Sequence, residues 1–263
     1  MFPGLPAHLL KRHPIEMEAD FGFVLVLTYA FPKAVLIPLL SPGLTLDTFG
    51  DLGFLAVAVV ETFNMRVRGF PKAISKNYNL IGYRLFVRYR TLRGKNLRGL
   101  RIIRSDVNSK SMAITGNLLT HYSFEEAEIE YKREEDFVHL RSNSKDGRSE
   151  LILIANINTP ADYLPPGSPF SSVQEALKFA GPMPFTFDYE EETNSIIRVE
   201  GVRQNWHPQP IEVDIEKFTF VHGPMFCDAE PLLCSAFYLQ NIPYYWNRGI
   251  REVLSSRENH HEK

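Results

Sequence analysis

A long alternating stretch from Phe54 to Arg68 gives the clearest secondary-structure signal in the chain. Apolar side chains recur there at every second position: Leu55, Val57, Val59, Phe63, Met65 and Val67. Successive side chains of an extended strand point to opposite faces, so these residues share one face. The pattern predicts a strand with one face against an apolar core.

The opposite face of this strand changes in character along its length. Ala56 and Ala58 are small, whereas Thr62, Asn64 and Arg66 are polar. Such a gradient is typical of a strand that lines a ligand cavity with a polar mouth. The alternative interpretation is a helix packed closely over the alanines, with the polar end reaching solvent. The sequence leaves both interpretations open.

Strand patterns occur along most of the remaining chain. Further strands are expected at residues 21–30, 83–90, 100–104, 126–131, 137–142, 151–157, 185–190, 196–204 and 211–220. Only two longer helices are expected, one over 109–119 and one that begins at the capping box of residues 172–175. The predicted fold class is therefore mostly β (α+β), with a few short helices. We expect a single domain over residues 1–254 and a disordered charged tail over 255–263.

Residues 21–40 form a stretch that is long and apolar enough to suggest a membrane span. Pro32, Lys33 and Pro38 interrupt it. A spanning helix would have to tolerate a charge and two breaks in its hydrogen-bond ladder. We therefore expect a buried strand, then a short helix opened by Pro32 and stopped by a turn at Ser41. No membrane partner is expected.

Composition narrows the choice of compartment and partners. The 263 residues are 44% hydrophobic and carry a net charge of −2, which gives no global attraction to nucleic acid or anionic lipid. Cys227 and Cys234 are too few for a disulfide framework, and free thiols fit a reducing compartment. Residues 1–14 lack the pattern of a secretory signal. We expect a cytoplasmic protein, and a homo-oligomer stays open.

Short motifs of the common enzyme classes are absent from the sequence. It has no glycine-rich phosphate loop, GxSxG elbow, HExxH, paired CxxC or Asp-rich calcium loop. The adjacent His260 and His261 lie in the charged tail, where nothing would hold a metal in fixed geometry. Neither a metal site nor a cofactor is therefore expected, and no motif identifies a catalytic residue.

Basic side chains are concentrated between Arg66 and Arg104. Twelve lysines and arginines occur in this stretch without one aspartate or glutamate. Tyrosines and phenylalanines interleave with them, as on strand surfaces that bind nucleic acid. The competing explanation is a solvated hairpin around Gly94, with charges balanced by the acidic run at residues 125–136.

Several short stretches occur in a familiar order between Arg12 and Trp246. They include Leu39-Leu40-Ser41-Pro42-Gly43-Leu44, Asp47-Thr48-Phe49-Gly50, Met65-Arg66-Val67-Arg68-Gly69, Tyr83-Arg84-Leu85-Phe86-Val87, Val202-Arg203, Trp206-His207-Pro208-Gln209-Pro210 and Pro243-Tyr244-Tyr245-Trp246. Together they resemble the YqjF-like family, a bacterial family of unknown function within the acetoacetate-decarboxylase-like superfamily. This resemblance implies a curved antiparallel sheet that closes into a barrel or cone around a pocket.

The decarboxylases of that superfamily use a lysine as a Schiff-base nucleophile. By the resemblance, the nucleophile position falls near Phe124 in a segment without lysine, and the decarboxylase arginine and glutamate fall near Ala30 and Ala56. Lys72 lies in a similar local sequence, but it precedes the predicted strand and helix that it should follow. Acetoacetate decarboxylase activity is therefore not expected, and whether the chain is an enzyme stays open.

Six residues are candidates for binding a ligand: Arg66, Arg84, His121, Trp206, His207 and Gln209. An arginine in a pocket clamps a carboxylate through its rigid fork. If the Tyr83 face of the same strand is the core side, however, Arg84 faces solvent. Trp206, His207 and Gln209 offer an aromatic wall and two hydrogen-bonding ends, or form a rigid corner flanked by prolines. His121, near the position implied for the nucleophile, is either a base or a structural histidine.

Three functions remain for the chain. The first is binding of a small ligand, possibly one with a carboxylate, in a β-barrel cavity and without a Schiff-base lysine. The second is an enzyme that acts on a small carboxylate or carbonyl compound by acid–base chemistry from His121, His207 or Glu61. The third is a nucleic-acid binder that uses the basic stretch 66–104.

Overall fold

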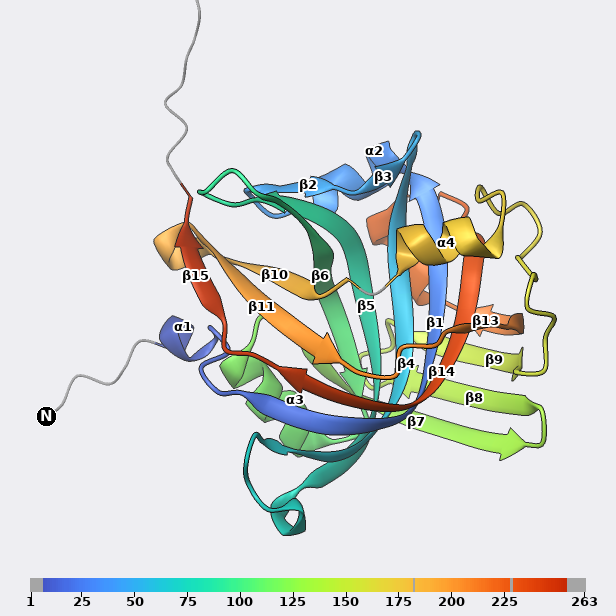
Figure 1. Ribbon diagram of the computed structural model, residues 1–263, viewed down its shortest axis with the longest axis horizontal. Helices are drawn as coiled ribbons and strands as arrows, with labels where there is room; N and C mark the ends of the chain where they lie inside the picture. The colour runs from blue at the N-terminus through green and yellow to red at the C-terminus, as the bar shows by residue number, and fades with distance from the viewer. Residues whose placement is uncertain (1–6, 182, 228, 255–263) are drawn as a thin grey trace, which may run out of the picture.

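The computed structural model describes residues 7–254 except 182 and 228, so the predicted disordered tail at 255–263 lies outside the described residues. Strands dominate this part of the chain (Figure 1). They are β1 (Met17–Pro32), β2 (Leu44–Leu46), β3 (Thr48–Phe49), β4 (Leu52–Val67), β5 (Lys76–Arg90), β6 (Asn96–Val107), β7 (Phe124–Glu134), β8 (Phe137–Ser144), β9 (Glu150–Asn156), β10 (Phe185–Glu190), β11 (Ser195–Arg203), β12 (Gln209–Pro210), β13 (Glu212–Phe218), β14 (Leu232–Trp246) and β15 (Ile250–Val253).

The helices of the described residues are short. They are α1 (Ala7–Leu10), α2 (Lys33–Leu36), α3 (Lys110–Leu119) and α4 (Val173–Ala180), with single 3-10 turns at Ile37–Leu39, Lys72–Ile74, Glu191–Thr193, Phe220–His222 and Pro224–Phe226. Ser109 caps α3 and Ser172 caps α4, each accepting a backbone hydrogen bond with its side chain. Both predicted helices are thereby confirmed.

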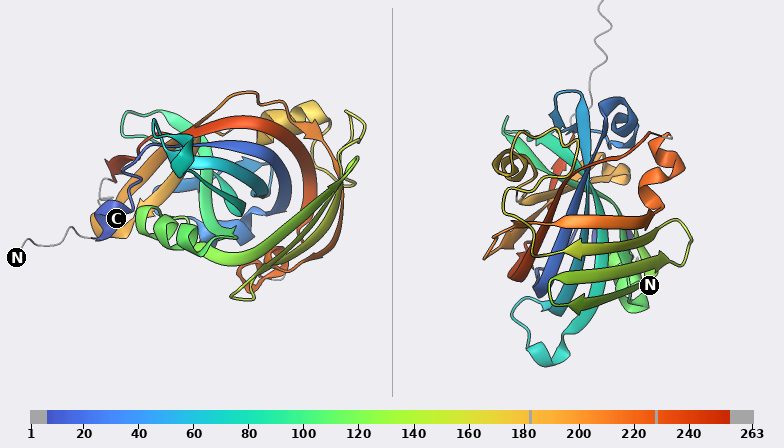
Figure 2. Two further views of the ribbon diagram at one scale, coloured as in Figure 1. Left: turned by 90° about the horizontal axis from the view of Figure 1, so that it is seen from below. Right: turned by 90° about the vertical axis from the view of Figure 1, so that its right-hand side faces the viewer.

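Seven strands of the sheet close into a ring. Their order is β5-β6-β10-β11-β14-β1-β4, and the pairing of β4 with β5 completes the circuit. Neighbours are antiparallel except for β10 beside β6. Register shifts in β1 and β4 bend these long strands, which is how a sheet acquires the curvature to close. Figure 2 shows the curved strands from below. The predicted mostly β fold, with a curved antiparallel sheet closing on itself, is confirmed.

The sheet continues beyond β6 as the four strands β7-β8-β9-β13, which lie across one side of the molecule (Figure 2). One face of β1, β4 and β5 packs against them. The largest apolar cluster joins Leu25, Val57 and Leu85 with Ile129 and Leu153. The alternation read from residues 54–68 therefore does mark a core face.

The opposite face of the same strands is also buried. Ala56 and Ala58 of β4 belong to a second apolar cluster with Val173 and Ala176 of α4. Of the two interpretations of the alanines, the structure therefore shows the packed helix. The central strands are sandwiched between two cores, so side chains of either parity are removed from bulk water.

β14 is the long strand that the sequence pattern did not predict. It pairs antiparallel with β1 along most of its length, from Trp246 opposite Met17 to Leu232 opposite Ala30. Its apolar residues do not alternate with polar ones, and Pro243 interrupts it. Residues 21–40 fold as most of β1, α2 and the following turn, and no helix in the described residues is long and apolar enough to span a membrane.

Candidate functional site

A cavity of about 170 Å³ lies where α3 meets β5 and β6. The ends of β1 and β14 complete its wall through Met17 and Trp246. Its polar lining side chains are His13, Tyr78, Arg84, Ser105, Thr115, Thr120 and Tyr122. The rest of the wall is mainly apolar and includes Ile15, Met65, Leu80, Ile102, Met112 and Leu119. A cavity of this size is comparable with one that holds a benzene ring.

Arg84 is the permanently charged group of this cavity. It lies on β5 between Ala56 of β4 and Ile102 of β6, and its guanidinium folds back over Gly82. A Cβ atom on Gly82 would lie 2.9 Å from Nε and 2.9 Å from Nη2 of Arg84. The absence of a side chain at residue 82 therefore makes the room that the guanidinium occupies. Arg84 is half-buried although the Tyr83 face is core, because both faces of β5 are covered.

The Arg84 guanidinium makes no hydrogen bond and no ion pair to any residue in the described ranges, and its Nε is fully buried. Burial lowers the pKa of Arg84; Tyr244 and Tyr122 oppose that shift, and the charge of Arg203 adds to it. A buried charge without a partner is costly, and proteins normally pair it or neutralise it. The half-buried Arg84 side chain, with its buried Nε unpaired in the described chain, is therefore a favourable position for an anion.

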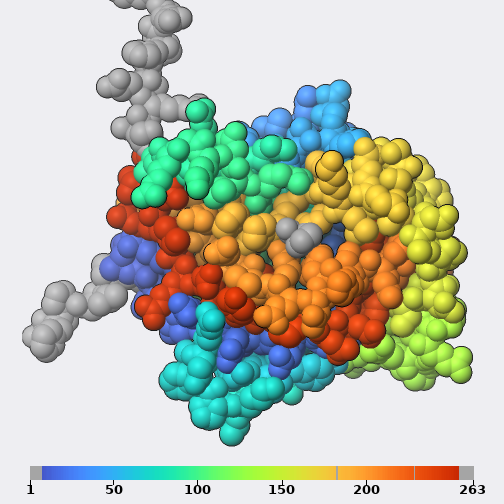
Figure 3. Space-filling view, viewed as in Figure 1, coloured from blue at the N-terminus to red at the C-terminus, as the bar shows by residue number. Residues whose placement is uncertain are grey.

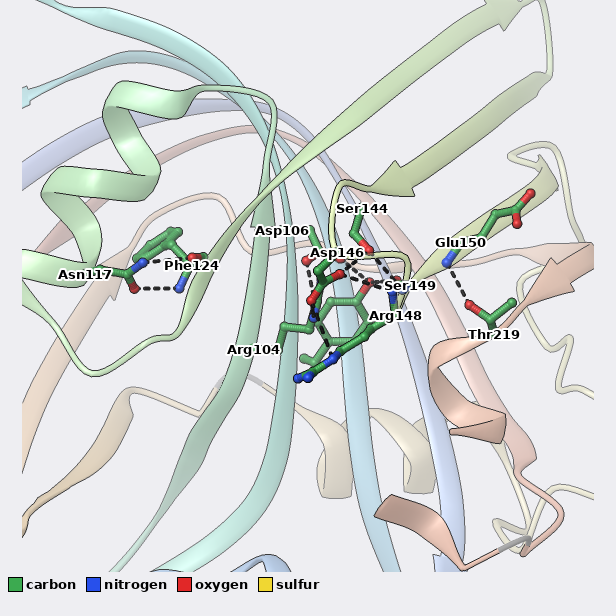
Figure 4. Close-up of polar contacts among 11 residues, drawn as sticks. Arg104, Asp106, Asn117, Phe124, Ser144, Asp146, Arg148, Ser149, Glu150 and Thr219 are labelled. Carbon is green, nitrogen blue, oxygen red and sulfur yellow. Dashed lines mark hydrogen bonds and ion pairs between the residues drawn. The ribbon is translucent and has the colours of Figure 1, made fainter. Parts of the chain in front are cut away.

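Arg104 on the neighbouring strand shows the usual arrangement (Figure 4). Its Nε donates to Asp106 at 2.7 Å, and its two terminal nitrogens donate to the two oxygens of Asp146 at 2.8 and 2.9 Å. The hydroxyl of Tyr83 donates to the other oxygen of Asp106 at 2.8 Å. On this face of β5 and β6 the guanidinium is therefore paired by carboxylates of the chain itself.

A second cationic group approaches Arg84 from the other side of the ring. Arg203 is on β11, three strands away from β5 in the ring, and it donates to the Met183 carbonyl at 2.6 Å. Its guanidinium lies 4.6 Å from the ring centroid of Trp206. Burial lowers the pKa of Arg203, which has no carboxylate within ion-pair distance among the described residues. Two guanidiniums that no carboxylate of the described chain neutralises make this interior favourable for an anion.

His13 forms part of the cavity wall, from the segment that precedes β1. Its Nε2 lies 3.3 Å from Oδ2 of Asp188 on β10, and its ring lies 4.7 Å from that of Tyr122. Neither His13 nor Arg203 is among the site residues that the sequence predicts. A lone histidine before the first strand carries no local signal, and the only signal for Arg203 was its place in a family-like stretch.

The other predicted site residues lie away from this cavity. Arg66 forms an ion pair with Glu18 at 2.7 Å and donates to two backbone carbonyls. His207 and Gln209 are exposed, and Trp206 is half-buried beneath Arg203. Of the six candidates, Arg84 alone lines the described cavity wall. Trp206 packs against Arg203, the second unneutralised guanidinium.

His121 lines a second, wider pocket of about 450 Å³ that also contains Arg101 and Asp188. Its Nε2 is fully buried and has no partner in the described residues, and burial lowers the pKa of the imidazole. Asp188 contacts His13 as well, so this carboxylate lies between the two pockets.

The position expected for a Schiff-base lysine is filled by Phe124, which is buried. Asn117 of α3 fixes it by accepting from the Phe124 N–H at 2.7 Å and donating to the Phe124 carbonyl at 2.8 Å (Figure 4). Lys72 lies in the hairpin between β4 and β5, which projects from the bottom of the molecule (Figure 3). Its ammonium is exposed, 3.5 Å from Asp20. The described cavity wall contains no lysine.

Much of the basic stretch 66–104 is neutralised by acidic groups from elsewhere in the chain. Arg88 and Arg98 both bond to Asp47, at 2.5 and 2.6 Å. Arg66, Arg68 and Lys72 pair with carboxylates at the beginning of β1 or just before it: Glu18, Glu16 and Asp20, respectively. The partners are therefore not the acidic run at 125–136 that the pattern suggested.

A family model described as an uncharacterized conserved protein (COG2071), DUF2071, matches residues 19–246. No curated protein matches the sequence. The resemblance to an uncharacterised family stated from the sequence is thereby confirmed.

Solved structures of acetoacetate-decarboxylase-like proteins share the fold. Acetoacetate decarboxylase from Legionella pneumophila is 11% identical over 91% of this chain and 87% of its own, with a TM-score of 0.59. An acetoacetate decarboxylase-like enzyme from Sphingomonas wittichii RW1 is 14% identical over 92% and 94%, with a TM-score of 0.57. The enduracididine biosynthesis enzyme MppR is 11% identical over 92% and 90%, with a TM-score of 0.60. At these identities the likeness shows the fold alone.

Proposed function

The chain belongs to the DUF2071 family of uncharacterized conserved proteins, and we propose that it binds a small ligand with a carboxylate and an apolar body in the cavity beside Arg84. The observation that carries this proposal is the Arg84 guanidinium, which lines the cavity and has no partner in the described chain. In this proposal the protein binds the ligand non-covalently and forms no Schiff base between the ligand and a lysine.

A carboxylate is the anion that suits this guanidinium. The planar fork of arginine presents N–H donors in the spacing of two carboxylate oxygens, and such charge-assisted pairs are stronger than neutral hydrogen bonds. A bound carboxylate would also satisfy the buried Nε, whose desolvation the fold alone leaves uncompensated. Arg203 across the ring adds attraction for the same negative charge.

The rest of the cavity selects an apolar body of limited size. Most of the lining is aliphatic or aromatic, including Met65, Leu80, Ile102 and Met112. A volume of about 170 Å³ admits a ligand of about the size of a benzene derivative or a short branched acid. MppR, which shares the fold, has been solved with pyruvate, and this supports a small carboxylate for the present chain too.

Thermal unfolding in the presence of small carboxylates tests the proposal. We expect butyrate, benzoate or a short 2-oxo acid to raise the melting temperature of the parent protein, because a ligand that binds only the folded state stabilises it by mass action. The matched uncharged compounds, such as benzyl alcohol, are expected to have much less effect. Arg84→Met is expected to abolish the response to the acids.

Arg66→Met is the matched arginine variant, since Arg66 already has Glu18 as its partner and lies outside the cavity wall. It is expected to lower the melting temperature slightly and to keep the full response to carboxylates. If no acid stabilises the parent protein, or if Arg84→Met still responds, the proposed binding site is wrong.

A further inference from the structure

We propose that His13, oriented by Asp188, is a general base that removes a proton from C3 of a 2-oxo acid held in the cavity by Arg84, so that the protein catalyses enolisation. This inference rests on the proposed function, because Arg84 must first bind the carboxylate. It adds a reaction and assigns a catalytic residue.

The backbone holds His13 in a fixed and uncommon conformation. Its φ of 52° lies in the left-handed region, where few non-glycine residues are found and where functional residues are over-represented. Its N–H donates to the Leu119 carbonyl at 3.1 Å, and its carbonyl accepts from the Gly249 N–H at 3.0 Å. The end of α3 and the turn between β14 and β15 therefore clamp the residue from two sides.

The preceding residue anchors the segment to β10. Arg12 makes a bidentate pair with Glu190, with nitrogen–oxygen distances of 2.7 and 2.6 Å. His13 reaches Asp188, which is two residues before Glu190 and on the same face of that strand. Two consecutive side chains thus contact alternate residues of one strand. This arrangement fixes the imidazole against Asp188 although the segment belongs to no strand itself.

The Asp188 contact determines which nitrogen can act as a base. A carboxylate 3.3 Å from Nε2 accepts a hydrogen bond there, so the neutral imidazole carries its proton on Nε2 and its lone pair on Nδ1. Nδ1 makes no hydrogen bond to any residue that the structure describes within 7–254. As imidazolium forms, the adjacent carboxylate stabilises it, which is the role of the acidic partner in histidine–aspartate pairs.

The cavity supplies the remaining requirements of the reaction. His13 and Arg84 are both on the wall of the same small cavity, and the proposed reaction requires one ligand to reach both side chains. A C–H bond beside a carboxylate alone is too weakly acidic for imidazole, whereas the ketone of a 2-oxo acid acidifies the protons at C3. The guanidinium that binds the carboxylate also favours negative charge on the neighbouring ketone oxygen.

The proposed step is balanced in protons and electrons. Nδ1 takes the C3 proton, the C–H electron pair becomes the C2–C3 double bond, and the carbonyl π electrons move to oxygen. The products are an enolate and imidazolium. Return of a proton from imidazolium to C3 regenerates the 2-oxo acid, so in deuterium oxide the net result is exchange of C3 hydrogen for deuterium.

Proton NMR of pyruvate in deuterium oxide and an amine-free buffer measures this exchange. We expect the parent protein to accelerate loss of the methyl signal, and His13→Asn to lower the rate at least about 100-fold, the usual contribution of a general base. Asparagine tolerates the left-handed conformation of residue 13. His13→Gln serves as a second variant, and the melting temperature with and without pyruvate shows whether each variant folds and still binds.

Further variants separate catalysis from binding and from structure. Asp188→Asn removes a positioning residue, and we expect a lower maximal exchange rate with little change in the pyruvate concentration for half-saturation. His222→Gln alters an exposed histidine that does not line the cavity and is expected to exchange like the parent. If pyruvate stabilises the parent protein but exchange is not accelerated, or if both folded His13 variants exchange at the parent rate, the inference is wrong and the binding proposal stands. If pyruvate and the other carboxylates fail to bind, the binding proposal itself is wrong.

Discussion

Arg84 occupies space that exists because the residue two positions earlier has no side chain. The neighbours of Arg84 on the same face of β4 and β5 are Ala56, Ala58 and Gly82, which are all small. The guanidinium can therefore fold along the sheet instead of extending to solvent. The small neighbouring residues leave space for this long, charged side chain beside the sheet, although it has no partner within the described chain.

Gly82→Ala tests this relation directly. Its Cβ would lie 2.9 Å from two guanidinium nitrogens, so Arg84 must move away from its present position. We expect weaker stabilisation by carboxylates with a largely retained melting temperature of the free protein, because Gly82 does not have a left-handed backbone. Titration of benzoate against the melting temperature measures the effect.

A double-mutant cycle provides the control for Gly82. In the Arg84→Met background, Gly82→Ala is expected to cause no further loss of the carboxylate response, because the group that it displaces is already gone. An equal loss in both backgrounds would show that Gly82 acts on the fold and not through Arg84.

The helix α3, which connects β6 to β7 in the chain, covers the cavity. Ser109 caps its first turn. Near its end, the side-chain amide of Asn117 forms hydrogen bonds with both the N–H and the carbonyl of Phe124. Gly116 allows the Phe124 ring to lie against the helix, since a Cβ there would be 2.4 Å from a ring carbon. The helix and the first residue of β7 thus form one connected unit over the site.

Asn117→Ala is expected to lower the free energy of unfolding by about 1–2 kcal/mol, because two hydrogen bonds to backbone groups are lost. Urea unfolding at neutral pH measures the change. Lys110→Ala, an exposed position on the same helix, is expected to change stability by less than about 0.5 kcal/mol. Equal losses in the two variants would contradict the role given to Asn117.

At the scale of the whole molecule, the segment before β1 and the end of β14 meet at one cavity. His13 precedes the first strand of the ring, and Trp246 ends the long strand that pairs with it. In the space-filling view, orange residues of β11 and the segment after it and red residues of β14 and β15 form much of the face toward the viewer (Figure 3). The fold is shared with acetoacetate decarboxylase, and the described cavity wall of this chain contains no lysine that could form a Schiff base.

Borohydride reduction with acetoacetate or pyruvate tests that difference at the level of the whole protein. We expect no covalent adduct by intact-protein mass spectrometry, because the described cavity wall has no lysine and Lys72 is an exposed, charged residue paired with Asp20. A trapped imine that Lys72→Gln abolishes would overturn the view that this chain lacks Schiff-base chemistry.

The sequence by itself determined the features that depend on neighbours along the chain. Alternation identified β4, proline and serine signals identified α2 and the starts of α3 and α4, and local patterns located most other strands within a few residues. These signals are local because a strand face, a helix cap and a proline break each involve residues only a few positions apart. The order of short stretches also identified the family and hence the curved sheet.

Only the tertiary structure decided which charged groups meet. Arg66 and Arg84 look equivalent in sequence, yet Arg66 finds Glu18 while Arg84 faces a cavity without a carboxylate. His13 meets Asp188 from 175 residues away, and β14 is stabilised by pairing with β1 despite its weak local pattern. Ion pairing and strand pairing depend on distance in space, which the closure of the ring sets and no local pattern encodes.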